Sequence, residues 1–334
     1  MRITLVSDAW YPQINGVVRT LNRVREELEA LDHQVTVIAP SDFKTIPCPT
    51  YPEIRLALRP GKPLAAKLEE SQPQAIHLPT EGPLGLAARS YCRKRGLPFT
   101  TSYHTRFPEY ISARAPVPVS WGYRFMRWFH GGSSGVMVAT PSLKRDLEGR
   151  GFTNLRQWSR GVDLTLFRPE PPGPPPLDLP KPVFLYVGRV AVEKNIEAFL
   201  KLDLPGSKLV VGDGPQLASL RKSYPEVHFA GAKVGEELAR HYALGDVFVF
   251  PSRTDTFGLV LLEAMASGLP VAAYPVTGPL DVVGGSGAGV LDEDLAKAAK
   301  AALELDPKVA RAYAERFSWR ACAEQFRGFL APFA

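Results

Sequence analysis

The chain has 334 residues, of which 45% are apolar, and a formal net charge of +6 at pH 7. This length exceeds one ordinary hydrophobic core, so we expect two domains of about 150 residues each. The three cysteines, Cys48, Cys92 and Cys322, are isolated in the sequence. Their isolation argues against a disulfide framework or a zinc knuckle and favours a reducing, cytoplasmic setting. The first residues are too polar for a signal peptide, and no apolar run reaches the roughly 18 residues that a membrane span needs.

The positive charge is concentrated in the first half of the chain. Residues 1–167 hold 22 Lys and Arg against 14 Asp and Glu, whereas the remaining residues hold 18 against 20. A basic half indicates an acidic partner, such as phosphate, anionic lipid or nucleic acid. It is equally compatible with an ordinary solvated surface.

Both halves alternate short apolar runs with helical stretches, a pattern typical of parallel sheets in α/β proteins. The expected strands of the first half are 3–6, 35–39, 75–78, 99–103 and 135–139, and those of the second half are 183–187, 208–211, 227–229, 247–250 and 271–273. Residues 168–182 are so rich in proline that we expect an extended linker there. The pattern therefore predicts two Rossmann-like domains, with ligands at the carboxyl ends of their strands.

In the first half, three polar motifs follow expected strands. The loop from Asp8 to Arg19 leads into a helix, Glu81 follows the third strand, and His104 ends the fourth. An isolated histidine is more often structural, but its place at a strand's carboxyl end favours a functional role.

The segment from Trp121 to His130 combines aromatic residues with Arg124 and Arg127. With Arg89, Arg93, Lys94 and Arg95 it could form an interfacial surface that meets anionic lipid headgroups, and Arg124, Arg127 and Trp128 are candidate acceptor or membrane residues. We favour the alternative, an aromatic core helix whose arginines extend to solvent.

The most informative segment is 251–268, which follows the strand 247–250. It begins with a small polar turn, continues as an apolar helix and ends at Gly268. Backbone N–H groups at the helix start, around Phe257, Gly258 and Leu259, suit a phosphate group. Asp255 lies just before this start and Glu263 lies within the helix, where both could accept hydrogen bonds from sugar hydroxyls. The alternative is that Asp255 caps the helix and Glu263 pairs with a buried Arg or Lys.

This segment resembles the signature of glycosyltransferase family 4, the retaining nucleotide-sugar transferases with a GT-B fold. The signature is two glutamates separated by seven residues, and here Asp255 replaces the first of them. Further motifs match along nearly the whole chain. The resemblance implies two Rossmann-like domains that face each other across a cleft: residues 1–167, joined by a terminal helix at about 317–334, and residues 183–316.

The resemblance also assigns roles to residues. Arg189 and Lys194, after Gly188, would stabilise the donor diphosphate, which cationic donors suit. Glu263 would bind the ribose, and Asp255 and His104 would orient the hexose. The remaining matches are backbone positions beside the donor: Gly16, Gly188, Gly212, Gly214 and Gly231.

We therefore expect a UDP- or GDP-sugar as donor substrate, with no metal and no other cofactor, because no Asp-x-Asp lies where a metal-dependent transferase would hold a cation. For the acceptor we expect a membrane lipid, with Glu81 as a candidate acceptor residue and an anionic membrane surface, not nucleic acid, as partner. The protein would then be cytoplasmic or peripheral on the inner face of the membrane. The alternatives are a nucleotide-sugar-binding protein without transfer activity and a GT-B-like epimerase or phosphorylase. The missing Gly-x-Gly-x-x-Gly argues against a dehydrogenase.

Overall fold

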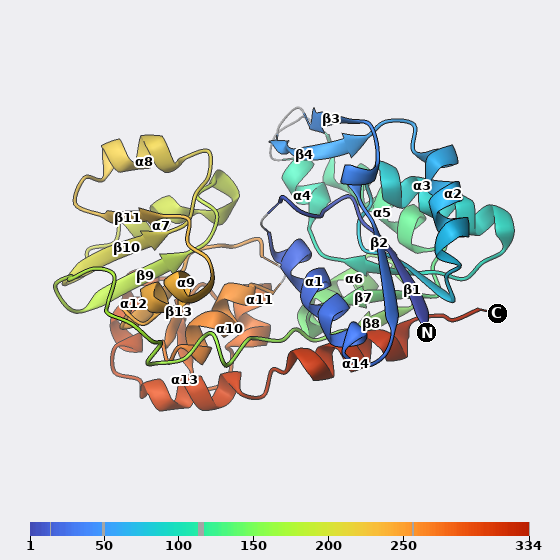
Figure 1. Ribbon diagram of the computed structural model, residues 1–334. Coiled ribbons are helices and arrows are strands. Elements are labelled where there is room, and N and C mark those ends of the chain that lie inside the picture. Colours follow the sequence, from blue (N-terminus) through green and yellow to red (C-terminus); the bar gives the residue numbers. More distant parts are fainter. Residues whose placement is uncertain (14, 49–50, 113–116, 256, 334) are drawn as a thin grey trace. The chain divides into compact units, whose positions relative to one another are not determined.

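The computed structural model describes residues 1–13, 15–48, 51–112, 117–255 and 257–333 of the chain. Ile14 and Thr256, which belong to two of the predicted motifs, lie outside the described residues. The chain forms two compact units, of which unit 1 comprises Met1–Arg160 with Trp319–Ala334 and unit 2 comprises Gly161–Ser318. Each unit is an α/β domain with its own parallel sheet (Figure 1).

The sheet of unit 1 has the strand order β2-β1-β5-β6-β7-β8, and all its pairs are parallel. Its strands are β1 (Arg2–Val6), β2 (Gln34–Ile38), β5 (Ala75–Leu78), β6 (Thr100–Tyr103), β7 (Gly135–Val138) and β8 (Leu155–Gln157). The helices are α1 (Gly16–Glu29), α2 (Gly61–Ser71), α3 (Pro83–Arg95), α4 (Phe107–Ser112), α5 (Val119–His130) and α6 (Pro141–Gly149). The central strands β5 and β7 are buried along their whole length, as expected for a parallel sheet covered on both faces.

The last helix, α14 (Trp319–Phe329), belongs to unit 1 although the chain reaches it only after unit 2. It packs against α1. The indole N–H of Trp158 donates to the Cys322 carbonyl at 3.0 Å, and the fully buried Phe326 ring lies 5.1 Å from the Trp158 ring. The C-terminal helix is therefore part of the core of unit 1.

The sheet of unit 2 has the order β11-β10-β9-β12-β13-β14, also fully parallel. Its strands are β9 (Val183–Val187), β10 (Ser207–Val211), β11 (His228–Gly231), β12 (Val247–Phe250), β13 (Val271–Ala273) and β14 (Gly289–Leu291). Its helices are α7 (Ile196–Leu200), α8 (Leu217–Ser223), α9 (Gly235–Tyr242), α10 (Leu259–Ala266), α11 (Thr277–Val282), α12 (Leu295–Ala302) and α13 (Pro307–Ala314).

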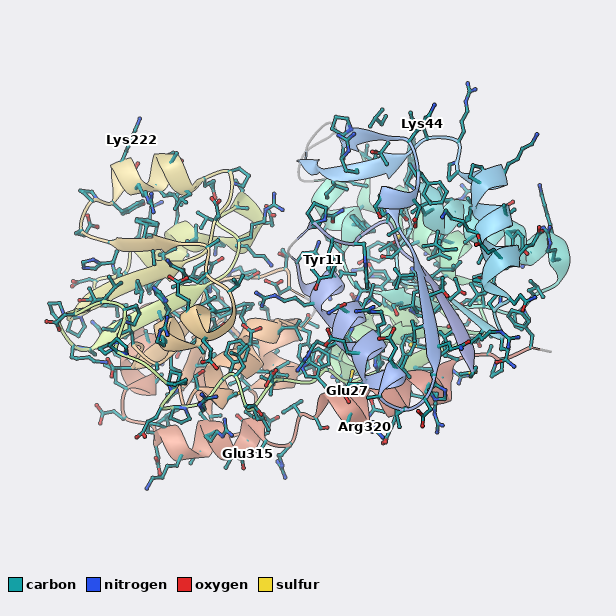
Figure 2. All side chains as sticks on the ribbon, viewed as in Figure 1. Tyr11, Glu27, Lys44, Lys222, Glu315 and Arg320 are labelled. Carbon is teal, nitrogen blue, oxygen red and sulfur yellow. The ribbon has the colours of Figure 1, made fainter. Side chains whose placement is uncertain are left out.

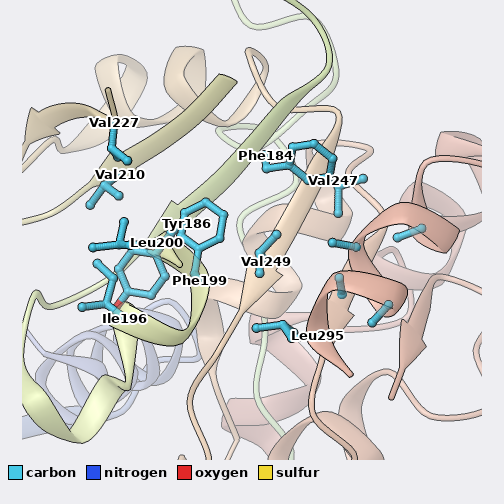
Figure 3. Packing of buried hydrophobic residues seen from close by; sticks show 14 of the residues in the cluster. Phe184, Tyr186, Ile196, Phe199, Leu200, Val210, Val227, Val247, Val249 and Leu295 are labelled. Carbon is cyan, nitrogen blue, oxygen red and sulfur yellow. The ribbon is translucent and has the colours of Figure 1, made fainter. Parts of the chain in front are cut away.

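One face of this sheet builds a core with α7 and α12. Figure 3 shows Phe184 and Tyr186 of β9 among Ile196, Phe199 and Leu295 of the covering helices. In contrast, charged side chains such as Lys222 on α8 lie on the solvent side of their helices (Figure 2). The apolar runs of the sequence are thus the sheet cores of both units.

All ten expected strands are present, with ends that differ by at most two residues from the prediction. The sequence pattern missed the antiparallel hairpin β3 (Thr45–Cys48) and β4 (Tyr51–Ala57), as well as the edge strands β8 and β14. The two edge strands have three residues each, too few to show a periodic pattern. Strand β3 contains Pro47, which argues against a strand in a sequence-based prediction.

Candidate functional site

The strand order of unit 2 reverses between β9 and β12, which are neighbours in the sheet. Such a reversal leaves a crevice at the carboxyl ends of the two strands, where α/β proteins bind ligands. The loop after β9 carries Arg189 and Lys194, and the loop after β12 carries Asp255 and Phe257. The predicted donor motifs therefore occupy the two loops at this reversal.

Side-chain contacts join these two loops. Lys194 Nζ lies 2.5 Å from Asp255 Oδ1, and both side chains are largely shielded from solvent, at 24% and 17% exposed. Asn195 Nδ2 donates to the Pro251 carbonyl at 3.1 Å, and the Thr254 hydroxyl donates to the Glu193 carbonyl at 3.1 Å. The loops therefore form one connected wall.

Asp255 does not cap the following helix. The N-cap residue of α10 is Gly258, whose φ of 84° lies in the left-handed region that favours glycine. The helix-cap alternative for Asp255 is therefore wrong, because its carboxylate pairs with Lys194 instead. Phe257 is buried beside this turn, and α10 begins at Leu259.

Glu263 lies on α10 and is buried among apolar residues, where an ionised carboxylate needs a polar partner. The hydroxyl of Tyr242, at the end of α9, donates to Glu263 Oε2 at 2.8 Å. Sequence reasoning missed Tyr242, because nothing in the sequence links a tyrosine to an acid 21 positions later. This hydrogen bond fixes one oxygen of the carboxylate that was predicted to bind ribose.

The glycines of the donor motifs form adjacent turns at the carboxyl ends of β9, β10 and β11. The N–H of Gly188 donates to the Val211 carbonyl at 3.0 Å, and that of Gly212 donates to the Gly231 carbonyl at 2.9 Å. A Cβ atom on Gly212 would lie 1.9 Å from the Gly188 carbonyl oxygen, and one on Gly214 would lie 2.4 Å from that of Val190. Only glycine fits these two turns, so the backbone itself forms this edge of the site.

Unit 1 has an equivalent reversal between β1 and β5, and here too polar groups gather. The Asp8 carboxylate, just after β1, accepts from the Thr80 hydroxyl at 2.9 Å and from the N–H groups of Leu84 and Gly85 at 2.8 and 3.1 Å. These N–H groups belong to the first turn of α3, so Asp8 ties the first loop to that helix. Burial raises the pKa of Asp8 above its ordinary value, although these hydrogen bonds oppose the shift.

Glu81 follows β5 and pairs with a residue that sequence reasoning did not single out. His130 Nε2 lies 3.1 Å from Glu81 Oε1, and its Nδ1 lies 2.9 Å from the Thr101 hydroxyl. Burial raises the pKa of Glu81, and the neighbouring His130 opposes that shift. The predicted acceptor residue is thus almost fully buried and held by a histidine from the end of α5.

His104 follows β6 and faces a buried arginine within unit 1. Its Nδ1 lies 3.5 Å from Arg160, whose guanidinium stacks on Trp158 at 4.1 Å and donates to the Trp158 carbonyl at 2.8 Å. Burial, and then the charge of Arg160, lower the pKa of His104 well below its ordinary value. The imidazole is therefore neutral near pH 7 and keeps one N–H donor.

Gly16 is the first residue of α1, and the preceding Asn15 caps this helix. The Asn15 side-chain oxygen accepts from the N–H groups of Val17 and Val18, both at 3.0 Å. The amide side chain of Asn15 thus has a structural role at the start of α1.

The interpretation of 121–130 as an aromatic core helix is wrong for half of its residues. Tyr123, Met126, Phe129 and His130 are buried, but the remaining aromatic and basic side chains of α5 are exposed. The candidates Arg124, Arg127 and Trp128 all lie on the exposed face. A helix that is aromatic on several sides does not show in its sequence which side is covered.

Within the described part of the chain, no three His, Cys, Asp or Glu side chains gather as ligands for a metal ion. No described helix is both long and apolar enough to cross a bilayer.

Two family models match successive parts of the chain. The model of Glycosyltransferase Family 4 matches residues 14–166, and the model of Glycosyl transferases group 1 matches residues 181–305. The chain belongs to glycosyltransferase family 4. This family 4 protein is 31% identical to the sulfoquinovosyl transferase of Arabidopsis thaliana, an alignment that covers 85% of the chain but only 61% of the Arabidopsis protein.

Two bacterial relatives align over more of their own length. The GDP-mannose-dependent alpha-mannosyltransferase of Mycobacterium tuberculosis is 29% identical to this family 4 protein over 85% of the chain and 81% of the relative. The alpha-monoglucosyldiacylglycerol synthase of Streptococcus pneumoniae is 27% identical over 82% of the chain and 71% of the relative.

Solved structures confirm the predicted GT-B fold of the family 4 protein. Sucrose-phosphate synthase of Thermosynechococcus elongatus has a TM-score of 0.76 at 22% identity, and the alignment covers 98% of each chain. The Anabaena protein HepE, solved in complex with UDP and glucose, has a TM-score of 0.73 at 17% identity, again with 98% of each chain covered.

Proposed function

We propose that this family 4 protein transfers a hexose from a UDP- or GDP-sugar to the hydroxyl group of a membrane lipid. The observation that most supports this proposal is the contact between the loops after β9 and β12, where Lys194 pairs with Asp255. Helix α10, with its buried Glu263, begins a few residues later. Cations, a helix N-terminus and acids in this order suit the diphosphate, ribose and hexose of a nucleotide sugar.

We assign the binding of the donor diphosphate to Arg189, Lys194 and the start of α10 at Phe257, Gly258 and Leu259. An ammonium group has three N–H donors, so Lys194 can keep its bond to Asp255 and still donate to a phosphate oxygen. Because Asp255 orients the ammonium group beforehand, little reorganisation accompanies the build-up of charge on the leaving diphosphate.

Glu263, Asp255 and His104 bind the two sugars of the donor, the ribose and the hexose. Glu263, fixed by Tyr242, accepts from the ribose hydroxyls. Asp255 accepts from a hexose hydroxyl, and His104, neutral and with one N–H, donates to another. The backbone at Gly231 lies beside the base. The backbone can also approach the donor closely at four further glycines: Gly16, Gly188, Gly212 and Gly214.

We propose transfer with retention and without a metal ion. The acceptor oxygen attacks the anomeric carbon on the face from which the diphosphate departs, and a donor phosphate oxygen takes the acceptor's proton. The bond between the anomeric carbon and the diphosphate breaks as the new glycosidic bond forms, and the nucleoside diphosphate leaves with that proton. Detection of a covalent glycosyl–protein adduct by mass spectrometry would refute this route.

For the acceptor, two observations support a lipid alcohol at an anionic membrane surface. The streptococcal relative is named as a synthase of alpha-monoglucosyldiacylglycerol, a glycolipid. Residues 1–167 carry the excess of positive charge described above. Glu81, held by His130, is the proposed acceptor residue of unit 1, and the protein would act as a peripheral protein on the cytoplasmic side.

A donor screen tests the proposal. UDP, GDP and a panel of UDP-hexoses and GDP-hexoses are each added to the purified protein, and the melting temperature is recorded. The true donor at 100 times its dissociation constant should add about 2.7 kcal/mol of stability. The same donor, incubated with diacylglycerol in mixed micelles, should yield a glycolipid. Donor binding without product would support a binding protein instead, and donor interconversion without acceptor would support an epimerase.

A further inference from the structure

Helix α5 presents a second apolar face that the protein core does not cover. Trp121 is 69% exposed, Trp128 54% and Phe125 40%, whereas Tyr123 and Met126 on the opposite side are buried. Large aromatic side chains at this exposure are costly in water, because they leave apolar surface solvated. Three of them within eight residues form a patch, in contrast to the scattered single residues of an ordinary surface.

The patch is ordered by its neighbours. Trp121, Arg124, Phe125 and Trp128 line a shallow depression, and the rings of Phe125 and Trp128 lie 5.9 Å apart. The Arg89 guanidinium stacks on Trp128 at 4.0 Å and donates to its carbonyl at 2.7 Å. These contacts hold Phe125 and Trp128 in place.

Helix α4 extends the apolar surface. It packs against α5, and the two helices approach closely at Gly122, where an added Cβ would lie 2.7 Å from Pro108. Phe107 and Ile111 on α4 are exposed large apolar residues. The Tyr123 hydroxyl donates to Glu109 at 2.6 Å, which fixes the orientation of the two helices from the buried side.

Among charged side chains, helices α3 and α5 bring only basic ones to this region. Helices α3 and α5, which are both described in full, contain no Asp or Glu. They carry six basic residues: Arg89, Arg93, Lys94, Arg95, Arg124 and Arg127. Arg95 pairs with Glu69, whereas Arg89 stacks on Trp128 and Arg124 lines the depression, so these two cations border the aromatic patch. An aromatic face with a basic rim matches the boundary between acyl chains and anionic headgroups.

We propose that the exposed face of α5, with Trp121, Phe125 and Trp128 at its centre, is the surface by which the protein docks on an anionic lipid bilayer. The aromatic rings insert at the level of the headgroups, and the arginines contact lipid phosphates. This inference deepens the proposed function by naming the docking element, and it rests on that function only for the lipid nature of the acceptor.

Sedimentation with vesicles tests the proposal without any transfer assay. The full chain should bind vesicles of equal parts phosphatidylcholine and phosphatidylglycerol, and bind phosphatidylcholine alone at least about tenfold less well. A double variant, Trp121→Gln with Phe125→Gln, should lose at least about tenfold in binding to the mixed vesicles. A matched control, Leu58→Gln with Val309→Gln, changes residues that are 47% and 40% exposed and should bind as the unaltered protein does.

A second variant tests the charges separately. Arg124→Gln with Arg127→Gln should weaken binding to the mixed vesicles by about tenfold, and high salt should abolish the difference between this variant and the unaltered protein. Thermal melting establishes that each variant is folded. Unaltered binding by both α5 variants, or failure of the unaltered protein to bind anionic vesicles, would overturn the inference. Vesicle binding without glycolipid formation would instead contradict the proposed function and leave the docking surface in place.

Discussion

Lys194 and Asp255 are 61 positions apart in the sequence, yet their side chains meet at 2.5 Å at the carboxyl edge of the unit 2 sheet. The contact joins the loop after β9 to the loop after β12, the two strands at which the strand order reverses. One residue of each predicted donor motif thus orients the other. The two side chains meet only when the sheet of unit 2 is folded, and their contact then sets the geometry of the proposed site.

Removal of the lysine charge should impair transfer far more than it impairs folding. We expect Lys194→Met to lower kcat/KM by about 10²–10³-fold, because a preoriented cation that stabilises the leaving group is lost. The control is Lys201→Met, which breaks the exposed pair with Glu197 and should leave activity unchanged. Steady-state assays of product formation check both; equal activity of the two variants would contradict the role of Lys194.

Asp255 and Lys194 should act as one unit. We expect Asp255→Asn to lower activity, and the double variant with Lys194→Met to lose less than the product of the two single effects, because contacting residues are not additive. The coupling free energy should be about 0.5–3 kcal/mol. Strictly multiplicative effects on kcat/KM would show that the two residues work independently.

Glu263 should recognise the ribose. We expect Glu263→Ala to weaken binding of the nucleoside diphosphate by about 10–100-fold, since a hydrogen bond to a charged group contributes about 1.5–3 kcal/mol. The control is a nucleotide that lacks the ribose hydroxyls: the unaltered protein should bind it weakly, and Glu263→Ala should no longer discriminate against it. Tyr242→Phe should have a smaller effect of the same kind, because it removes only the bond that orients the carboxylate. Calorimetric titration measures all three; full discrimination by Glu263→Ala would place the ribose elsewhere.

His77 should make the protein less stable as the pH falls. Burial, and then the charge of His130, lower the pKa of His77 from 6.5 to about 3. The unfolded chain therefore takes up this proton at a higher pH than the folded chain does. The free energy of unfolding should thus fall, for this group, by about 1 kcal/mol per unit between pH 6 and pH 5. Asp8 and Glu81 have raised pKa values and act in the opposite direction, so the comparison must be between variants.

His77→Gln isolates that contribution. Glutamine can still bond with Thr100 and Ser102, which lie 2.9 and 2.8 Å from the imidazole nitrogens. Urea unfolding of this variant at pH 6 and pH 5 should show a slope with pH that is shallower than that of the unaltered protein. The exposed His228→Gln should keep the original slope. An unchanged slope in His77→Gln would contradict the expectation.

The terminal helix should be essential to the stability of unit 1. Phe326 is fully buried, and its ring lies 5.1 Å from Trp158 and 4.8 Å from His77. We expect Phe326→Ala to cost about 3–5 kcal/mol of unfolding free energy. The neighbouring exposed Arg327→Ala should change it by less than about 0.5 kcal/mol. Urea denaturation measures the unfolding free energy of both variants. A loss under about 1 kcal/mol for Phe326→Ala would show that α14 is only loosely attached.

The sequence predicted those features that depend on local patterns. Strands such as β9 and β10 end in apolar runs, and the glycine turns at Gly188 and Gly212 follow them directly. Because parallel strands end at the same edge, motifs that are far apart in the chain could be assigned to one site.

Features that depend on packing between distant elements could not be predicted. The partners Tyr242 and His130 approach Glu263 and Glu81 only because particular helices cover particular strands. Likewise, periodicity shows that α5 has apolar faces but not which of them the core covers, so the exposure of Trp121 emerged only from the structure.

Stereochemistry of the product tests the central proposal most directly. The donor identified by the screen, with an α-linked hexose, is incubated with the protein and with diacylglycerol in anionic vesicles, and the glycolipid is analysed by nuclear magnetic resonance. The account predicts an α-glycosidic linkage, formed by the unaltered protein and lost with Lys194→Met. A β-linked product, or no glycolipid with any UDP- or GDP-hexose, would contradict it.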